Sequence, residues 1–269
     1  MTPLARRLVT PIIGRRRLQG VFERLHELSL AGMNLGEGAN PRTSGESHVL
    51  AWLASDLFAS RHRAVVLDVG ANVGNYTDAV LAAMGGRAEV WALEPSASAF
   101  AVLESRGQAH VRNIGLSDRE RQAVLHSPAR ASNVASLHDQ TARLNRLQTV
   151  VDAPETVQLT TLDRFCAREG IGHIDLLKLD VEGHETRVLD GASRMIEAGA
   201  IDVIQFEVGA ANLVSRTFLR DFFDRLEHRY VIHRVLSDGL RALPRYRESH
   251  EAFKRATNYL AVARRLGHG

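Results

Sequence analysis

Polar and glycine residues follow the apolar run at residues 64–67 in a pattern that could bind a ligand. The segment Asp68-Val-Gly70-Ala-Asn72-Val-Gly74-Asn-Tyr76 ends this run and opens a helical pattern. Glycines and backbone N–H groups at the start of a helix let a ligand approach the chain closely. The glycine spacing is G-x-x-x-G, whereas a dinucleotide pyrophosphate is typically bound by G-x-G-x-x-G. The segment therefore disfavours a nicotinamide or flavin cofactor.

A carboxylate ends the next apolar run, because Glu94 follows residues 89–93 and precedes Pro95. Its acceptor oxygens could bind both ribose hydroxyls of an adenosine. Alternatively, Glu94 caps the helix that begins near Ser96. A third polar segment, residues 113–118, ends the following run and is placed to meet an adenine. Open α/β sheets bind ligands at the carboxyl ends of their strands. We therefore predict one nucleoside cofactor site made of Asp68, Gly70, Asn72, Gly74, Tyr76, Glu94, Asn113 and Ser117.

Two later apolar runs end in groups that could act in acid–base chemistry. Asp180 follows residues 174–179, His184 lies in the turn after it, and Glu207 ends residues 201–207. A charged group that closes a buried strand is costly unless it is paired or used, and a carboxylate or histidine can take the proton of an alcohol. We predict Asp180, His184 and Glu207 as the catalytic residues. For Asp180 the alternative is a helix cap, and for His184 a polar residue of the first helical turn.

Metal chemistry is the less favoured interpretation of the same carboxylates. Asp180 and Glu207 on neighbouring strand ends could bind Mg²⁺ together with water. No third ligand is evident, because Val208 and Gly209 offer no side-chain oxygen, and we predict no metal site.

Lys178 either pairs with a carboxylate such as Glu207 or extends to the sheet edge. The single cysteine, Cys166, excludes an internal disulfide and a zinc framework, and indicates a reducing, cytoplasmic setting.

The apolar runs alternate with helical patterns, which predicts the fold. Between residues 64 and 114 the order is strand, helix, strand, helix, strand, the signature of a parallel, doubly wound sheet. The alternation continues to residue 263 after a polar insertion at residues 115–154, where we expect a hairpin and a mobile loop near residues 127–134. The predicted fold is α/β, with a Rossmann-like, mostly parallel sheet of seven strands.

The first sixty residues are predicted to form an N-terminal arm and a helical extension or lid, and residues 61–269 the main domain. A helix at residues 17–31 is expected to pack on that domain, and residues 32–47 form a loop. Five arginines precede the first acid, Glu23, so the arm could make a weak peripheral contact with anionic lipid; the alternative is a solvated arm.

The formal charge of +3 gives no support for nucleic-acid binding. No run reaches the roughly 20 apolar residues of a membrane span.

Taken together, the segments resemble the FkbM-type methyltransferases over roughly residues 32–263. The similarity includes the segments 68–76, Glu94-Pro95 and 113–118, and above all Leu177-Lys-Leu-Asp180-Val-Glu182-Gly-His184-Glu with residues 188–192. It implies a class I methyltransferase fold, S-adenosylmethionine as the methyl donor, and a hydroxyl acceptor on a small molecule such as a sugar, a glycan or a secondary metabolite. Residues 1–17 lie outside the pattern.

Two other functions share these features. A nicotinamide-dependent oxidoreductase would have the same sheet and an acid after the second strand, but the glycine spacing and the cluster at residues 180–185 argue against it. A non-catalytic adenosine-binding protein could keep the fold, since a fold alone does not establish activity. The acceptor and the oligomeric state are not specified by the sequence, because the loops that would shape an acceptor site are uninformative in composition.

Overall fold

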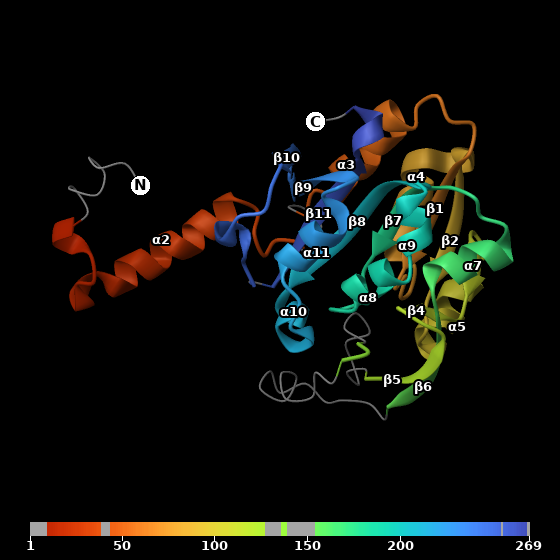
Figure 1. Cartoon of the computed structure of the whole chain (residues 1–269), viewed down its shortest axis with the longest axis horizontal. Helices are drawn as coiled ribbons and strands as arrows, with labels where there is room; N and C mark the ends of the chain where they lie inside the picture. Colours follow the sequence, from red (N-terminus) through yellow and green to blue (C-terminus); the bar gives the residue numbers. More distant parts are fainter. Residues whose placement is uncertain (1–9, 39–43, 127–135, 139–153, 254, 268–269) are drawn as a thin grey trace.

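The computed structural model describes residues 10–38, 44–126, 136–138, 154–253 and 255–267 (Figure 1). The helices are α2 (Gln19–Gly32), α3 (Glu46–Trp52), α4 (Asn75–Met84), α5 (Ala97–Ser105), α7 (Leu162–Glu169), α8 (Glu185–Asp190), α9 (Ser193–Glu197), α10 (Ala210–Ser215) and α11 (Leu219–Leu226), with the π-helical turn η3 (Leu53–Leu57) after α3. The strands are β1 (Ala64–Val69), β2 (Ala88–Leu93), β3 (His110–Arg112), β4 (Gly115–Leu116), β5 (Arg121–Leu125), β6 (Glu155–Thr160), β7 (Ile174–Leu179), β8 (Ile201–Gly209), β9 (Tyr230–Leu236), β10 (Gly239–Leu243) and β11 (Ala256–Ala263). Short 3₁₀ turns are η1 (Thr10–Ile12), η2 (Arg16–Leu18), η4 (Gly85–Arg87), η5 (Glu248–His250) and η6 (Arg264–Leu266).

The main sheet has the order β10-β9-β11-β8-β7-β1-β2-β3. The five strands from β3 to β8 are parallel, whereas β11 runs antiparallel between β8 and β9. The predicted doubly wound, mostly parallel α/β fold is confirmed. The sheet has eight strands rather than the expected seven, because the chain reverses at Ser237 and Asp238 and adds β10 to the edge. The short β10 is only partly buried, so the alternation of apolar and polar residues in its sequence does not clearly predict a strand.

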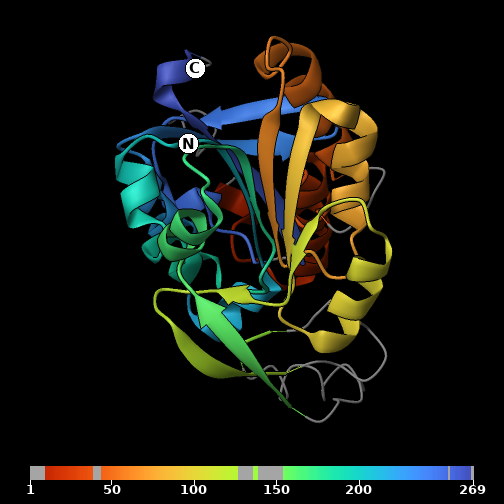
Figure 2. The ribbon, with the colours of Figure 1, turned by 90° about the vertical axis from the view of Figure 1, so that its right-hand side faces the viewer.

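Helices cover both faces of the main sheet (Figure 2). One core joins α7, α8, α9 and α11 to one face, where Leu67, Leu177 and Ile204 point. The other core joins α3, η3 and α4 to the opposite face, where Val66 and the neighbouring strands' Leu176 and Val203 point. Because successive residues of a strand face opposite sides, strands buried on both faces appear in the sequence as continuous apolar runs. This is why β1, β7 and β8 were predictable.

A small second sheet, of order β4-β6-β5, continues from the end of β3. The strand β6 was expected in the regular alternation, but it pairs with β4 and antiparallel with β5 instead. Because β6 follows the insertion, this antiparallel pair is not the hairpin expected within residues 115–154. The predicted mobile loop near residues 127–134 lies outside the described residues.

The predicted N-terminal extension contains two parts that behave differently. Residues of α3 and η3, including Val49, Leu50 and Leu53, are buried in the second core. The helix α2 has no buried residue and extends away from the sheet (Figure 1). The expectation that it packs on the main domain is therefore wrong. Helical periodicity predicts an apolar face, but it does not say what covers that face. No helix in the described part of the chain is long and apolar enough to cross a membrane.

A short segment after α2 connects this helix to the sheet. The Asn34 amide donates to Val235 O over 3.0 Å, and Leu35 is buried. The Gly36 N–H donates to Thr257 Oγ1 over 2.8 Å, and the Gly38 N–H to Ala256 O over 2.7 Å. Part of the predicted loop at residues 32–47 is thus fixed against the start of β11. Its residues 39–43 are outside the described ranges.

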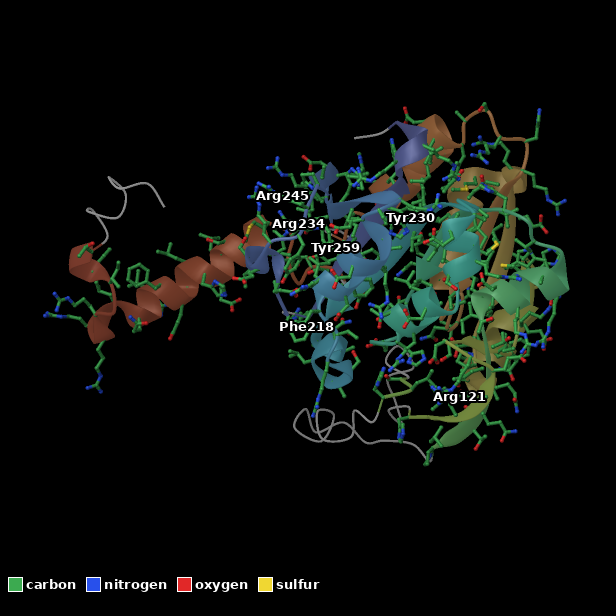
Figure 3. All side chains as sticks on the ribbon, in the orientation of Figure 1. Arg121, Phe218, Tyr230, Arg234, Arg245 and Tyr259 are labelled. Carbon is green, nitrogen blue, oxygen red and sulfur yellow. The ribbon has the colours of Figure 1, made fainter. Side chains whose placement is uncertain are left out.

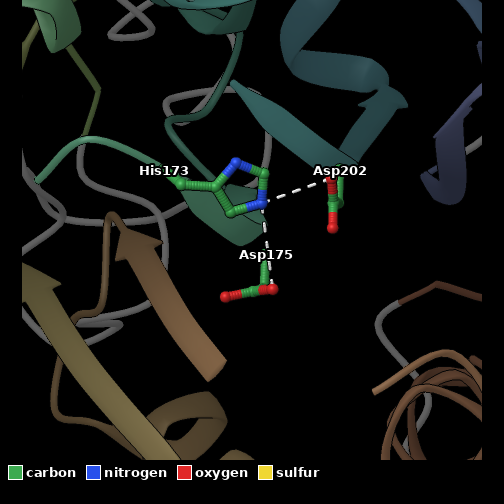
Figure 4. A group of neighbouring side chains, drawn as sticks. All are labelled: His173, Asp175 and Asp202. Carbon is green, nitrogen blue, oxygen red and sulfur yellow. Dashed lines mark ion pairs between the residues drawn. The ribbon is translucent and has the colours of Figure 1, made fainter. Parts of the chain in front are cut away.

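A charged cluster ties together the amino ends of β7 and β8 (Figure 4). Arg61 donates to Asp175 and Asp202 over 2.5 Å each, and His173 Nε2 lies 3.3 Å from Asp202 Oδ1. Arg265 also pairs with Asp202. The two carboxylates and the histidine are close enough to hold a metal ion, but two guanidinium groups already neutralise them. The cluster is therefore better explained as a structural ion-pair network.

Replacing Arg61 by leucine should lower the free energy of unfolding by about 2 to 3 kcal/mol. Two buried carboxylates lose a shared cation, which is costly, and the partial exposure of Arg61 keeps the effect near the range for charged hydrogen bonds. Arg63→Leu is the matched control, because Arg63 is 66% exposed and pairs with Glu89 at the surface; it should cost under about 0.5 kcal/mol. Urea unfolding measures both. Equal effects in the two variants would contradict the structural importance of the cluster.

Candidate functional site

Polar side chains form two successive rows on one face of the main sheet, near the carboxyl ends of its parallel strands. In the first row Asp68 pairs in register with Lys178, and Lys178 with Gln205. Two residues further along β8, Glu207 pairs with Asn258 of β11. Residues paired across strands share a face, as do residues two apart on one strand. The row before these is the apolar set at Val66, Leu176, Val203 and Val262, so the site begins where the core of this face ends.

Lys178 is the buried cation of the site. Its side chain is 2% exposed, and its Nζ lies 3.2 Å from Asp180 Oδ2 and 3.7 Å from Glu46 Oε1. The ammonium also lies 5.4 Å from the ring centre of Tyr76, a favourable cation–π contact. Burial alone would lower the pKa of Lys178, but the carboxylates of Asp180 and Glu46 outweigh it and raise the pKa. Of the two sequence-based alternatives, the structure shows pairing, and the contacting carboxylate is Asp180 rather than Glu207.

Glu46 and Gln205 complete this network and were missed by the sequence analysis. The Gln205 amide donates to Glu46 Oε1 over 3.1 Å, and the Tyr76 hydroxyl donates to Gln205 Oε1 over 2.8 Å. Burial raises the pKa of Glu46. Gly45 brings Glu46 to the sheet, because it has a φ of +76° and a Cβ there would lie 2.1 Å from Leu236 O. The segment Ser44-Gly45-Glu46 lies within residues 32–263, the range of the family resemblance, and this was the available signal.

Asp180 and Glu207 lie in different environments. The Asp180 side chain is 43% exposed and contacts Lys178. Burial and the neighbouring Asp180 carboxylate raise the pKa of Glu207 well above its usual range. Two carboxyl groups whose environments differ in this way can take opposite proton-transfer roles. Lys178 pairs with Asp180, whereas Glu207 is the carboxyl whose pKa is raised.

Asn258 is a further polar group that the sequence analysis did not single out. It is 3% exposed, and its amide donates to Gly38 O at 3.5 Å. Its Oδ1 is buried and has no hydrogen-bond partner within the described part of the chain. Buried polar atoms are normally satisfied, so an unsatisfied acceptor beside Glu207 is a position where a ligand group could donate.

The turn between β1 and α4 has an unusual backbone conformation. Gly70, Asn72 and Gly74 have φ values of +81°, +50° and +91°. A Cβ at Gly70 would lie 1.9 Å from Asp180 O, so this glycine allows the turn to lie directly against the turn after β7. Asp68 holds the start of α4, because it accepts a 2.7 Å hydrogen bond from Thr77 Oγ1. Burial raises the pKa of Asp68 to about 6.

Glu94 connects this turn to the turn after β2. It is 5% exposed, and its two oxygens accept from the Asn72 N–H and the Ser96 N–H, each over 2.8 Å. Burial raises the pKa of Glu94 to about 7. An ionised carboxylate has further lone pairs, so capping near Ser96 leaves acceptor capacity for a ligand. The Asn113 amide donates to Glu94 O and Pro95 O over 2.9 and 3.0 Å, which fixes the backbone of this turn.

His184 and Ser117 form a separate group. Ser117 Oγ lies 3.0 Å from His184 Nε2, and His184 Nδ1 lies 3.4 Å from His138 Nε2. His184 is 3% exposed, and burial lowers its pKa to about 4, so the ring is neutral. The structure thus brings Asp180 and Glu207 together around Lys178, and it places His184 with Ser117 towards the small sheet.

Residues 68–232 match the family model described as the Methyltransferase FkbM domain. A search of curated proteins found no match. Among solved structures, the methyltransferase FkbM from Methylobacillus flagellatus KT is 14% identical with a TM-score of 0.44, over 74% of this chain and 44% of that chain. The matched region thus spans less than half of that protein. An O-methyltransferase from Bacillus cereus, solved in complex with SAH, is 13% identical with a TM-score of 0.40, over 96% of this chain and 97% of that chain.

Replacing Gly70 by alanine should lower the free energy of unfolding by about 3 to 5 kcal/mol, because left-handed strain adds to the overlap with the Asp180 carbonyl. Gly170→Ala is the matched control, since Gly170 also has a left-handed conformation, with a φ of +73°, but no atom within 4 Å of the added Cβ. It should cost about 1 to 2 kcal/mol. Thermal and urea unfolding of both variants measure the difference. A Gly70→Ala protein as stable as the control would show that the two turns are not in close contact.

Proposed function

The chain belongs to the FkbM family of methyltransferases, and we propose that it transfers a methyl group from S-adenosylmethionine to a hydroxyl of a sugar, a glycan or a secondary metabolite. Its fold is the class I methyltransferase fold. The observation that carries the proposal is that Gly70 brings the turn joined to Glu94 directly against the turn that holds Asp180. A nucleoside bound by the first turn would therefore lie next to a base on the second.

The residues of the first turn fit the adenosine part of the cofactor. Glu94 has acceptor capacity beyond its two backbone N–H groups, and ribose hydroxyls are donors. The positive-φ turn at residues 70–74 supplies a side-chain-poor backbone at the start of α4, where a ligand can approach. We propose Asp68, Gly70, Asn72, Gly74, Tyr76, Glu94, Asn113 and Ser117 as the set that binds or shapes this site. When bound, S-adenosylmethionine supplies an electrophilic methyl group on a sulfonium.

Methyl transfer to an alcohol requires that the acceptor oxygen be held in line and that its proton be removed. We assign proton removal to Asp180, which is partly exposed and adjacent to the Lys178 ammonium. Glu207, whose pKa is raised by burial and by Asp180, would donate a hydrogen bond to the acceptor. The unsatisfied Oδ1 of Asn258 would accept one. Lys178 is a positioning residue that holds the Asp180 carboxylate through its ammonium.

His184 is proposed to act indirectly. Both of its ring nitrogens lie within 3.4 Å of another side chain, Ser117 or His138, so it supports the turn that follows Asp180. A Mg²⁺ ion at Asp180 and Glu207 remains the less favoured alternative. The Lys178 ammonium lies 3.2 Å from Asp180, and it would repel a divalent cation bound to the same carboxylate. The proposed reaction therefore uses no metal ion, and methyl transfer should persist in excess chelator.

A cytoplasmic setting is part of the proposal. Cys166 is buried, and burial raises the pKa of its thiol to about 12, so it is a packed side chain rather than a reactive one. The acceptor is proposed to be a small molecule or a glycan.

Calorimetric titration and a turnover screen test the function. The protein should bind S-adenosylmethionine and not NAD, which separates it from a nicotinamide oxidoreductase. A panel of hydroxylated sugars and metabolites should include acceptors that release S-adenosylhomocysteine catalytically. Cofactor binding without turnover on any hydroxylated compound would instead favour a non-catalytic adenosine-binding protein, and the absence of cofactor binding would refute the proposal.

Cofactor affinity should depend on the protonation of Glu94. Its pKa of about 7 is raised from the usual value, so the carboxylate is ionised above that pH and protonated below it. Lowering the pH from about 8 to about 6 should weaken S-adenosylhomocysteine binding by about tenfold, because a protonated carboxyl accepts fewer ribose hydrogen bonds. Glu94→Gln should bind about 1.5 to 3 kcal/mol more weakly and lose this pH dependence. Titration calorimetry at both pH values measures it, and a pH profile unchanged in Glu94→Gln would reject the assignment.

Replacing Asp180 by asparagine should lower kcat by about 10²- to 10⁴-fold, the usual contribution of a general base. Cofactor affinity should stay near that of the wild type, because none of the assigned cofactor residues is on β7 or on the turn after it. Single-turnover kinetics with an acceptor from the screen, together with calorimetry, separate the two effects. Near-normal turnover would remove Asp180 from the chemistry, and lost cofactor binding would make it a binding residue.

A further inference from the structure

The helix α2 carries an apolar stripe that no part of the described chain covers. The half-buried Leu18 at the end of η2 is followed by Val21, Leu25 and Leu28 of α2 at intervals of three, four and three residues. Val21, Leu25 and Leu28 are 53%, 50% and 69% exposed. Figures 1 and 3 show the helix extending away from the sheet. Large aliphatic side chains grouped on one exposed face indicate an interaction surface.

The helix is too short to be stable in water without a partner. It has 14 residues and no buried side chain, and isolated helices of this length are marginal even with favourable sequences. The interval of three and four residues is the heptad pattern of a helix that packs on another helix along a narrow seam. The surface therefore fits a second amphipathic helix.

We infer that α2 pairs antiparallel with α2 of a second copy of this chain. In an antiparallel pair centred on Glu23, Leu18 of one copy lies opposite Leu28 of the other, and Val21 lies opposite Leu25. All four stripe residues are then covered by stripe residues of the second copy, and the arrangement is symmetric. A two-fold interface of this kind is the commonest way in which identical chains associate.

The charges on and before α2 favour this orientation. Arg15, Arg16 and Arg17 precede the helix, and its acids are Glu23 and Glu27. A parallel pair would place the two arginine triplets side by side, and like charges repel. An antiparallel pair separates the triplets and places each opposite residues 29–31, at the carboxyl end of the other helix, where positive charge is favourable.

The same charges disfavour a lipid surface as the partner. A helix that lies on an anionic membrane is typically rich in lysine and arginine on its polar face. The polar face of α2 has the two acids Glu23 and Glu27 but only one arginine, Arg24. The arginine triplet is basic, but it precedes the helix, and within α2 the charge of Arg24 is offset by Glu23 and Glu27.

Sedimentation velocity of the full chain tests the pairing without a methyl acceptor or cofactor. The wild type should be a dimer, and a Leu25→Asp/Leu28→Asp variant should be a monomer at the same concentration. Leu213→Asp is the matched control, because Leu213 is a 57% exposed leucine on α10; it should remain a dimer. Unchanged urea unfolding of the main domain shows that each variant is folded. A monomeric wild type, or a dimeric double variant, would overturn the proposal.

Disulfide trapping tests the orientation. Mixing a Val21→Cys protein with a Leu25→Cys protein under mild oxidation should give the mixed disulfide, whereas neither protein alone should cross-link through α2. Cross-linking of each variant with itself would show a parallel pair and overturn the antiparallel assignment. Flotation with vesicles of anionic phosphatidylglycerol is the third measurement. A monomer that floats with these vesicles through Leu25 and Leu28 would assign the stripe to lipid instead.

Discussion

The ammonium of Lys178 imposes the constraint on which the site depends, because it is a charge placed within the main sheet. Such a charge is tolerated only when it is closely paired. Its partners come from three places: Asp180 follows its own strand, Glu46 begins α3, and the Tyr76 ring lies on α4. Satisfying one cation therefore fixes the position of two helices and the exit of β7. The carboxylate proposed as the base is held by the same contact.

Charged side chains are balanced differently at the amino ends and at the carboxyl ends of the parallel strands. At the amino ends of β7 and β8, two arginines neutralise two buried aspartates, so the charges balance within the protein. At the carboxyl ends, the single ammonium of Lys178 faces more than one carboxylate, and burial and Asp180 raise the pKa of Glu207. Asn258 Oδ1 is unsatisfied in the same place. Local mismatches of this kind are expected where a protein binds and transforms a ligand.

The parts of the site that were predictable from sequence are those carried by single strands. The runs that end at Asp68, Glu94, Asp180 and Glu207 identify buried strands. Glu94 and Asp180 directly follow β2 and β7 as expected, whereas β1 continues to Val69 and β8 to Gly209, so Asp68 and Glu207 lie within their strands. Glu46 and Asn258 reach the site from far along the chain, through a loop and an inserted strand, and no local pattern specifies such contacts. The absence of a local pattern for distant contacts also explains the wrong placement of α2. The sequence of α2 specifies its helical periodicity, but it does not specify which surface the helix packs on. The strand β6 was recognised, but its pairing depends on β4 and β5.

The position of β11 has a consequence for the order of assembly. It is the last strand of the described sheet in the sequence, yet it lies inside the sheet between β8 and β9. It also carries Asn258 and receives the segment at residues 36–38, more than 200 positions earlier. The group of polar side chains at the carboxyl ends of the parallel strands can therefore be completed only after nearly all other strands have formed. Its completion depends on contacts between distant parts of the chain, and such contacts form slowly. A nascent chain that has made β1 to β9 has most of its core but still lacks its finished site.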